Sequence, residues 1–297
     1  MTYEEIEFST LDGATLRGRF YPPAGEGPYP AVILYTGIGG VAEHLYDSVE
    51  PFVEAGLAVF AYDHRSFGLS EGEPRQLIDP WRQSRDSRDA VTYLTSRVDV
   101  DSDRIGLWGI SLGGAVSLFV AAVDKRVKAV VSIVPPVSGR SARTLFPPRQ
   151  LAELEELILD QRLALLRGEP ALLIKTNGRR DPDGPPVMFD NPEGAEFTDE
   201  FKAYDTYRNE IALLSLPNLF EFEPTAYAAQ LELPVLLVTA DGDTVAPVED
   251  ALEMYARIPE PKEHWSYPGQ HYGILLHQYR EIVARTADWI APALIGD

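Results

Sequence analysis

The sequence predicts an α/β protein with a mostly parallel central sheet, flanking helices and an inserted helical lid. Three observations lead to this prediction. Short, continuously apolar segments alternate with helix-length segments, which is typical of a parallel sheet covered by helices. Two further strand-like segments precede this alternation. The alternation stops near residue 137 and resumes near residue 231, which indicates an insertion between two parts of one sheet.

The first half of the chain is expected to open with an antiparallel hairpin. Residues 3–9 and 14–21 are predicted as two strands joined by the turn Leu11-Asp12-Gly13. A loop at 22–30 then leads into the alternating region. Strands are expected at 31–35, 57–62, 104–108 and 127–134, and helices at 43–55, 81–96 and 112–123. This order predicts parallel strands joined by helical crossovers.

The second half divides into the insertion and the remainder of the sheet. Within 137–230 we expect an amphipathic helix at 151–166, a turn-rich loop at 181–186, and aromatic side chains of which about half line a pocket. The sheet pattern then resumes with strands at 233–239 and 263–267 and helices at 248–257 and 274–290. The predicted division is therefore 1–136 and 231–297 for the core and 137–230 for the lid. The insertion's aromatic residues are Phe189, Phe197, Phe201, Tyr204, Tyr207, Phe220, Phe222 and Tyr227.

The composition limits the partners. With 46 acidic against 26 basic residues the formal charge is -20, which argues against nucleic acid and anionic membranes. The N-terminal segment has neither a basic leader nor an apolar h-region, and no run approaches the roughly 18 apolar residues of a membrane span. The absence of cysteine excludes disulfides and a cysteine nucleophile. We therefore expect a cytoplasmic protein that acts on a small molecule; a homodimer remains open.

The motif with the clearest chemical meaning lies between a predicted strand and a predicted helix. Gly109-Ile110-Ser111-Leu112-Gly113 fits G-x-S-x-G. In that pattern the serine occupies a strained turn whose close neighbours leave no room for side chains at the flanking positions. The hydroxyl then stands at the amino end of a helix, where backbone N–H groups can face a developing oxyanion. We interpret Ser111 as a nucleophile; the alternative is a serine that only caps the helix.

A serine nucleophile needs a base. Of the five histidines, only His271 is expected in a loop directly after the last predicted strand. The chain order serine, acid, histidine places the base in that loop. His264 begins that strand and His277 lies in the next helix, so both are interpreted as structural. His44 and His64 precede the serine and are second-line candidates near the pocket mouth.

The base in turn needs an orienting acid. The loop after strand 233–239 contains Asp241 and Asp243. We prefer Asp243 as the acid and interpret Asp241 as a turn residue.

The loop after strand 31–35, Thr36-Gly37-Ile38-Gly39-Gly40, supports two hypotheses. In the first, the oxyanion hole combines the N–H of Leu112 with that of Ile38. In the second, the loop fits G-x-G-x-x-A before a helix, and Asp63 follows as a ribose-binding acid would, so the protein binds a dinucleotide. The preceding hairpin, which a Rossmann half lacks, argues against the second.

No cofactor is expected from the motifs. The chain has no H-E-x-x-H, no P-loop and no pair of histidines at the spacings that place two ligands on one face. We therefore expect neither a metal site nor a P-loop nucleotide site.

Taken together, these motifs resemble the α/β-hydrolase fold and, within it, the serine hydrolases around the dienelactone-hydrolase-like, Xaa-Pro-dipeptidyl-peptidase-like and fungal polyketide-transferase-like proteins. The resemblance rests on residues 36–41, on 63–75 (DHRSFGLSEGEPR), on the elbow at Ser111, and on 243–247 followed by 269–271. It implies that Ser111 is the nucleophile, Asp243 the acid and His271 the base. One departure is Thr36, where many relatives have histidine. The resemblance also implies that residues 63–70 form a structural turn.

Four functional hypotheses follow. The first is a serine hydrolase that cleaves an ester, lactone or thioester with a hydrophobic acyl part through an acyl-enzyme on Ser111. The second keeps the acyl-enzyme and transfers the acyl group to an alcohol or amine. The third is a dinucleotide-binding module, and the fourth is a non-catalytic binding protein that merely keeps the fold.

Overall fold

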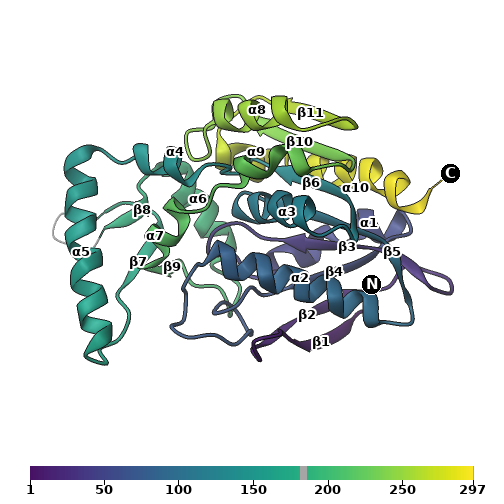
Figure 1. Cartoon of the computed structure of the whole chain (residues 1–297), viewed down its shortest axis with the longest axis horizontal. Helices are drawn as coiled ribbons and strands as arrows, with labels where there is room; N and C mark the ends of the chain where they lie inside the picture. The colour runs from purple at the N-terminus through teal and green to yellow at the C-terminus, as the bar shows by residue number, and fades with distance from the viewer. Residues whose placement is uncertain (181–185, 297) are drawn as a thin grey trace.

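An eight-stranded sheet forms the centre of the computed structural model, which describes residues 1–180 and 186–296 (Figure 1). Its strand order is β1-β2-β4-β3-β5-β6-β10-β11. Only the β1–β2 and β2–β4 pairs are antiparallel, so the prediction of a mostly parallel sheet after an antiparallel hairpin is confirmed. The strands are β1 Glu4–Ser9, β2 Thr15–Tyr21, β3 Tyr29–Tyr35, β4 Ala58–Tyr62, β5 Val100–Ile110, β6 Val127–Ile133, β10 Val235–Ala240 and β11 Lys262–Tyr267.

Helices cover both faces of this sheet. Successive side chains of a strand point to opposite faces, so neighbouring residues of β3 pack against different helices. On one face, Ile33 packs in a core with α2 (Pro80–Ser96) and α3 (Leu112–Val123). On the other, its neighbours Val32 and Leu34 pack with α1 (Glu50–Glu54) and α10 (Tyr279–Ile295). The second face also holds the fully buried Trp108, whose indole N–H donates to Thr286 Oγ1 on α10 at 2.9 Å.

Two predicted helices are each divided in the structure, and both predictions are corrected. The segment predicted as one helix at 43–55 is a 3-10 helix, η1 (Ala42–Ser48), followed by α1. Pro51 lacks the N–H that would continue one helix and instead occupies the first turn of α1. The segment predicted as one helix at 274–290 is α9 (His271–His277) followed by α10, with Gln278 between them at φ -118° and ψ 0°.

The insertion separates β6 from β10, which are neighbours in the sheet. Beside its helices it contains three short strands that the sequence analysis did not predict, in the order β8-β7-β9. Segments of three to five residues carry too few side chains for a periodic signal. The predicted loop at 181–186 lies outside the described residues except for Pro186, and the division at 136 and 230 remains a prediction. The elements are α4 Gly139–Thr144, α5 Pro148–Leu166, β7 Leu173–Asn177, β8 Val187–Phe189, α6 Pro192–Phe201, β9 Glu210–Ala212, α7 Ser215–Phe220 and η2 Pro224–Gln230.

Hydrogen bonds and one close packing contact attach the insertion beside the carboxyl ends of β3 and β4. The Ala212 N–H on β9 donates to the carbonyl of Gln76, in the loop after β4, at 2.8 Å. The Ile78 N–H in the same loop donates to Ser215 Oγ at 2.9 Å. A Cβ at Gly39, in the loop after β3, would lie 3.4 Å from Thr176 Oγ1 on β7. The small sheet of the insertion is thereby held against the loops that follow the central strands.

Among the described residues, no helix has a stretch that could span a lipid bilayer.

Candidate active site

Ser111 lies at the sharp turn between β5 and α3. Its backbone has φ 52° and ψ -123°, a conformation that is strained for a residue with a side chain. Its side chain makes no capping bond to α3, so the alternative of a simple helix cap is not what the structure shows. The turn is possible because Gly109 and Gly113 approach each other: a Cβ on Gly109 would lie 2.3 Å from the Gly113 carbonyl oxygen.

This close approach predicts a measurable cost for the smallest side chain. Gly109→Ala is expected to lower the free energy of unfolding by about 1–3 kcal/mol, because the added methyl group collides with backbone that cannot move aside cheaply. Urea unfolding measures the difference. Gly273→Ala is the matched control, since its Cβ would lie within α9 at an ordinary contact distance of 3.7 Å from the Glu193 carboxylate. Equal stabilities for the two variants would contradict the steric argument.

The three residues predicted for the triad meet at one point. Ser111 follows β5, Asp243 follows β10, and His271 begins α9 just after β11. His271 Nε2 is 3.1 Å from Ser111 Oγ, and His271 Nδ1 is 2.7 Å from Asp243 Oδ2. The side chains of His271 and Asp243 are almost entirely buried. His271 was expected in a loop; it is instead the first residue of a helix.

The two candidate carboxylates have different partners. Asp243 Oδ1 accepts hydrogen bonds from the N–H groups of Val245 and Ala246 at 2.9 and 2.8 Å, while its other oxygen faces His271. Asp241 is exposed and accepts a hydrogen bond from the Ser266 hydroxyl on β11. Only Asp243 therefore contacts the candidate base.

The remaining histidines lie in other surroundings. His264 bonds Thr239 across the β10–β11 pair at 2.9 Å. His277 ends α9. His64 is buried and stacks on Tyr35, with ring centroids 5.6 Å apart. His44 lies between the rings of Tyr204 and Tyr207 and lines the cavity next to Ser111, and burial lowers its pKa to about 4.

Burial of His64 makes stability depend on pH. Burial lowers its pKa from 6.5 to about 4, because the charged form would be poorly solvated. Since the folded pKa lies below the unfolded one, this residue's contribution is fully present above pH 6.5 and is lost as pH falls toward 4. The 2.5-unit gap corresponds to about 3 kcal/mol. Urea unfolding between pH 7 and pH 4 is expected to show a smaller fall in stability for His64→Phe than for the parent protein.

Comparing His64→Phe with the parent protein isolates the contribution of His64, because the neighbouring Asp63 is present in both proteins. The pKa of Asp63 is raised by burial to about 6, so its contribution has the opposite sign and grows as pH falls. Parallel pH curves for His64→Phe and the parent would contradict the prediction.

The candidate ribose-binding acid, Asp63, holds loops together. Its Oδ1 accepts the Ala42 N–H at 2.7 Å and its Oδ2 accepts the Leu69 N–H at 2.8 Å. The residue is only 5% exposed. Its carboxylate is thus occupied by backbone donors on both sides, as expected of a structural turn at 63–70.

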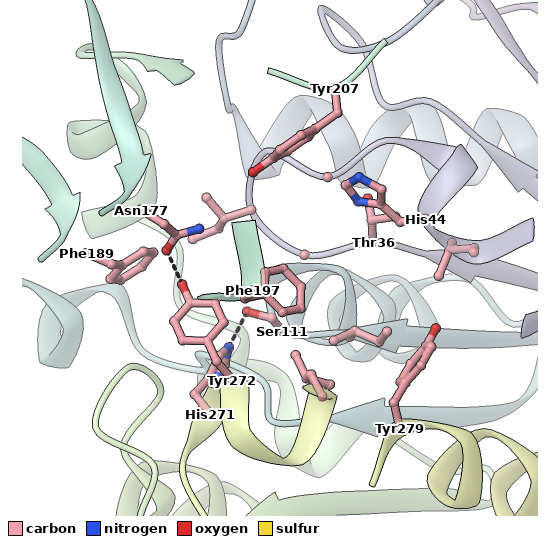
Figure 2. A pocket seen from close by; sticks show the side chains of 16 residues that line it. Thr36, His44, Ser111, Asn177, Phe189, Phe197, Tyr207, His271, Tyr272 and Tyr279 are labelled. Atoms are coloured by element: carbon pink, nitrogen blue, oxygen red, sulfur yellow. Dashed lines mark hydrogen bonds between the residues drawn. The ribbon is translucent and has the colours of Figure 1, made fainter. Parts of the chain in front are cut away.

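Two cavities meet at Ser111. The first has a volume of about 70 Å³ and the second of about 290 Å³. Ile38, Ser111 and Phe189 line both cavities, Leu112 lines the second, and His271 lines the first. Figure 2 shows the first cavity with Ser111 and His271 at its base and Asn177, Phe197 and Tyr207 around it.

The predicted oxyanion donors lie next to the serine. A Cβ on Gly37 would be 3.1 Å from Ser111 Cβ, so the loop that carries Ile38 packs directly against the candidate nucleophile. Leu112 is the first residue of α3, where backbone N–H groups have no intrahelical acceptor. Thr36, on the same loop, lines the first cavity.

The insertion supplies aromatic walls to both cavities. Phe189, Phe197 and Tyr207 line the first, and Phe189, Phe220 and Phe222 line the second. Two others pack elsewhere: Tyr227 against Phe119 with ring centroids 4.8 Å apart, and Tyr204 against His44. The side chain of Phe201 lies outside the described residues.

Sequence reasoning missed Asn177, Tyr272 and Tyr279, which all line the first cavity. Tyr272 directly follows His271 in the sequence, so the motif at 269–271 could have indicated that it lies near the site. Asn177 had no local signal, because only the folding of β7 over the glycine loop brings it to the site. Among the described residues, no three acidic or histidine side chains are placed to share a metal ion.

Known proteins resemble this chain along nearly its whole length. The family described as X-Pro dipeptidyl-peptidase (S15 family) matches residues 12–273. The thiohydrolase aneE of Aspergillus aculeatus is 30% identical over 285 residues, which cover 93% of this chain and 88% of the relative. The polyketide transferase ATR5 of Stachybotrys chlorohalonatus is 33% identical over 267 residues, covering 89% and 87%.

A solved structure shows the same architecture. The α/β hydrolase GrgF from Penicillium sp. sh18 superposes with a TM-score of 0.86 at 28% identity, over 99% of this chain and 100% of that one. The similarity therefore includes the insertion as well as the central sheet.

Proposed function

The chain belongs to the X-Pro dipeptidyl-peptidase (S15) family of α/β hydrolases, and from that premise we propose that it cleaves an ester, lactone or thioester through an acyl-enzyme on Ser111. The observation that carries this proposal is the hydrogen-bonded row of Ser111, His271 and Asp243 at the meeting point of two cavities. Each member has the partner that nucleophilic catalysis requires.

In the first half of the reaction, Ser111 Oγ attacks the acyl carbonyl carbon while His271 Nε2 accepts the hydroxyl proton. The His271 Nδ1–H donates to Asp243, whose carboxylate stabilises the imidazolium that forms. The N–H groups of Ile38 and Leu112 are the proposed donors to the oxyanion. His271 then gives the proton to the leaving oxygen or sulfur, and the acyl group stays on Ser111.

In the second half, His271 takes a proton from water, and the resulting hydroxide attacks the acyl carbon. The bond to Ser111 Oγ breaks, the proton returns to that oxygen, and the carboxylic acid leaves. Burial of the His271 and Asp243 side chains supports this sequence, since a water-poor site strengthens the interactions on which each proton transfer depends.

A hydrophobic acyl part is proposed from the walls of the second cavity. Phe146, Leu219, Phe220 and Phe222 contribute apolar surface there, close to Leu112. A hydrocarbon chain placed against these side chains leaves water at roughly 25 cal/mol per Å². A chain-length series of esters tests this: a preference for small, polar acyl groups would contradict it.

Acyl transfer is the second candidate function. It is favoured by the relative named polyketide transferase, at 33% identity, and the thiohydrolase relative favours hydrolysis. An alcohol or amine would attack the same acyl-enzyme in place of water. Product analysis with added acceptors separates the two, because water and acceptor compete for one intermediate.

Treatment with a fluorophosphonate, followed by intact-protein and peptide mass spectrometry, tests the acyl-enzyme directly. A single adduct on Ser111, missing in Ser111→Ala, is the expected result. No adduct on the folded protein would overturn the proposal. The binding hypotheses would then be tested next, beginning with protection by NAD or NADP in a thermal melt.

A further inference from the structure

The two cavities differ in their relation to the proposed base. Both are lined by Ser111 and Ile38, but among the described residues His271 lines the first and not the second. Leu112, the other proposed oxyanion donor, lines the second. The scissile carbonyl would thus lie at the junction, with its two substituents directed into different cavities.

Proton transfer decides which substituent goes where. His271 Nε2 must reach the leaving atom in the first step and the incoming nucleophile in the second, within hydrogen-bond distance of each. Both atoms therefore lie on the His271 side. The acyl chain takes the opposite direction, into the aromatic second cavity.

Asn177 presents a buried amide donor to the His271 side. The residue is 5% exposed and lines the first cavity. The Tyr272 hydroxyl donates to Asn177 Oδ1 at 2.6 Å, which directs the amide nitrogen away from Tyr272 and toward the cavity (Figure 2). Within the described part of the chain, no hydrogen bond uses that nitrogen as donor.

Two hydrogen bonds to Asn209 hold the backbone of Asn177 in place. Its N–H donates to Asn209 Oδ1 at 2.9 Å, and Asn209 Nδ2 donates back to the Asn177 carbonyl at 2.7 Å. Tyr272 in turn packs edge-on against His271, with ring centroids 5.2 Å apart. The Asn177 amide nitrogen is therefore held at a fixed position relative to His271, as a preorganised binding group requires.

We propose that the cavity lined by His271 receives the leaving group and the acceptor, and that Asn177 selects those carrying a hydrogen-bond-accepting oxygen. This inference rests on the proposed function. A hydroxylated, ether or carbonyl-bearing alcohol or thiol would satisfy the Asn177 amide, while a hydrocarbon would leave it unpaired. Phe189, Phe197 and Tyr207 would pack against the carbon skeleton of the same group.

The test compares two esters of one fatty acid, n-butyl and 2-methoxyethyl, whose alcohol parts have the same length and differ by the replacement of one CH₂ group by oxygen. The parent protein is expected to favour the methoxyethyl ester in kcat/KM by about tenfold. Asn177→Leu, which has a similar volume and no donor, is expected to abolish that ratio. Tyr272→Phe is expected to reduce it less, because the amide keeps its donor but loses its fixed orientation.

A change in the other cavity provides the reciprocal control. Ala142 is partly exposed on α4 and lines the second cavity. Ala142→Phe is expected to lower kcat/KM for long acyl chains while leaving the ratio between the two alcohols unchanged.

Two outcomes would overturn the inference while leaving the acyl-enzyme intact. One is turnover of both esters by the parent with no preference; the other is an Asn177→Leu variant that alters acyl-length selection and leaves the alcohol ratio unchanged. If a panel of esters and thioesters gives neither turnover nor a Ser111 adduct, both the inference and the proposed function fail.

Discussion

Replacing Ser111 by alanine is expected to lower kcat by roughly a millionfold, the loss typical of a triad without its nucleophile. The hydroxyl is the atom that bonds the acyl carbon, and among the described residues it is the hydrogen-bond partner of His271 Nε2, at 3.1 Å. Steady-state hydrolysis of an activated ester measures the loss. The variant is expected to keep its fold, since Ser111 Oγ makes no capping bond to α3.

Ser117→Ala is the matched control. Ser117 is fully buried in the same helix, and its hydroxyl donates to the Gly113 carbonyl at 2.7 Å, away from His271. Its loss is expected to change kcat less than about threefold, because a helix-internal hydrogen bond of this kind contributes about 1 kcal/mol to stability and none to the chemistry. Residual turnover above a hundredth of the parent value in Ser111→Ala would contradict the proposed nucleophile.

The second large effect is expected at the acid. Asp243→Asn should lower kcat by about 10⁴-fold, because it reverses the imidazole tautomer. The amide oxygen would face the N–H groups of Val245 and Ala246, which leaves the amide nitrogen facing His271 Nδ1. Nδ1 must then accept a hydrogen bond, so the proton moves to Nε2. A protonated Nε2 cannot take the proton of Ser111.

Asp241→Asn is the control for this variant, since it makes the same chemical change two residues away. Its side chain bonds the Ser266 hydroxyl and has no contact with His271, and an amide can still hydrogen-bond a hydroxyl. The expected change in kcat is less than about threefold. A larger loss in Asp241→Asn than in Asp243→Asn would reverse the assignment of the acid.

The sequence was sufficient for the succession of strands and helices along the chain and for the candidate residues that follow the parallel strands. A continuous apolar strand such as β3 is recognisable because burial on both faces leaves a local mark on composition. The glycines around Ser111 are recognisable because the turn tolerates no Cβ. Ser111, Asp243 and His271 each come after a parallel strand, and the carboxyl ends of parallel strands share one edge of a sheet, which favours their meeting there.

The interior of the insertion could not be predicted in the same way. Its strands β7, β8 and β9 are short, and their pairing joins residues far apart in the chain, such as Lys175 with Glu210. The breaks between η1 and α1 and between α9 and α10 were missed because apolar periodicity continues across them. Such details follow from packing against distant elements, which leaves no regular pattern in the chain.

The sequence by itself determined the α/β architecture, the elbow at Ser111 and the identity of the candidate acid and base. Only the tertiary structure decided that Asn177 bonds Tyr272 and shares a cavity with His271, that Asp63 is occupied by backbone donors, and that one serine lines two cavities. The physical reason is the range of the interactions. Turn sterics and strand burial act on neighbouring residues, whereas the direction of a side-chain donor is set by atoms that only folding brings within 3 Å.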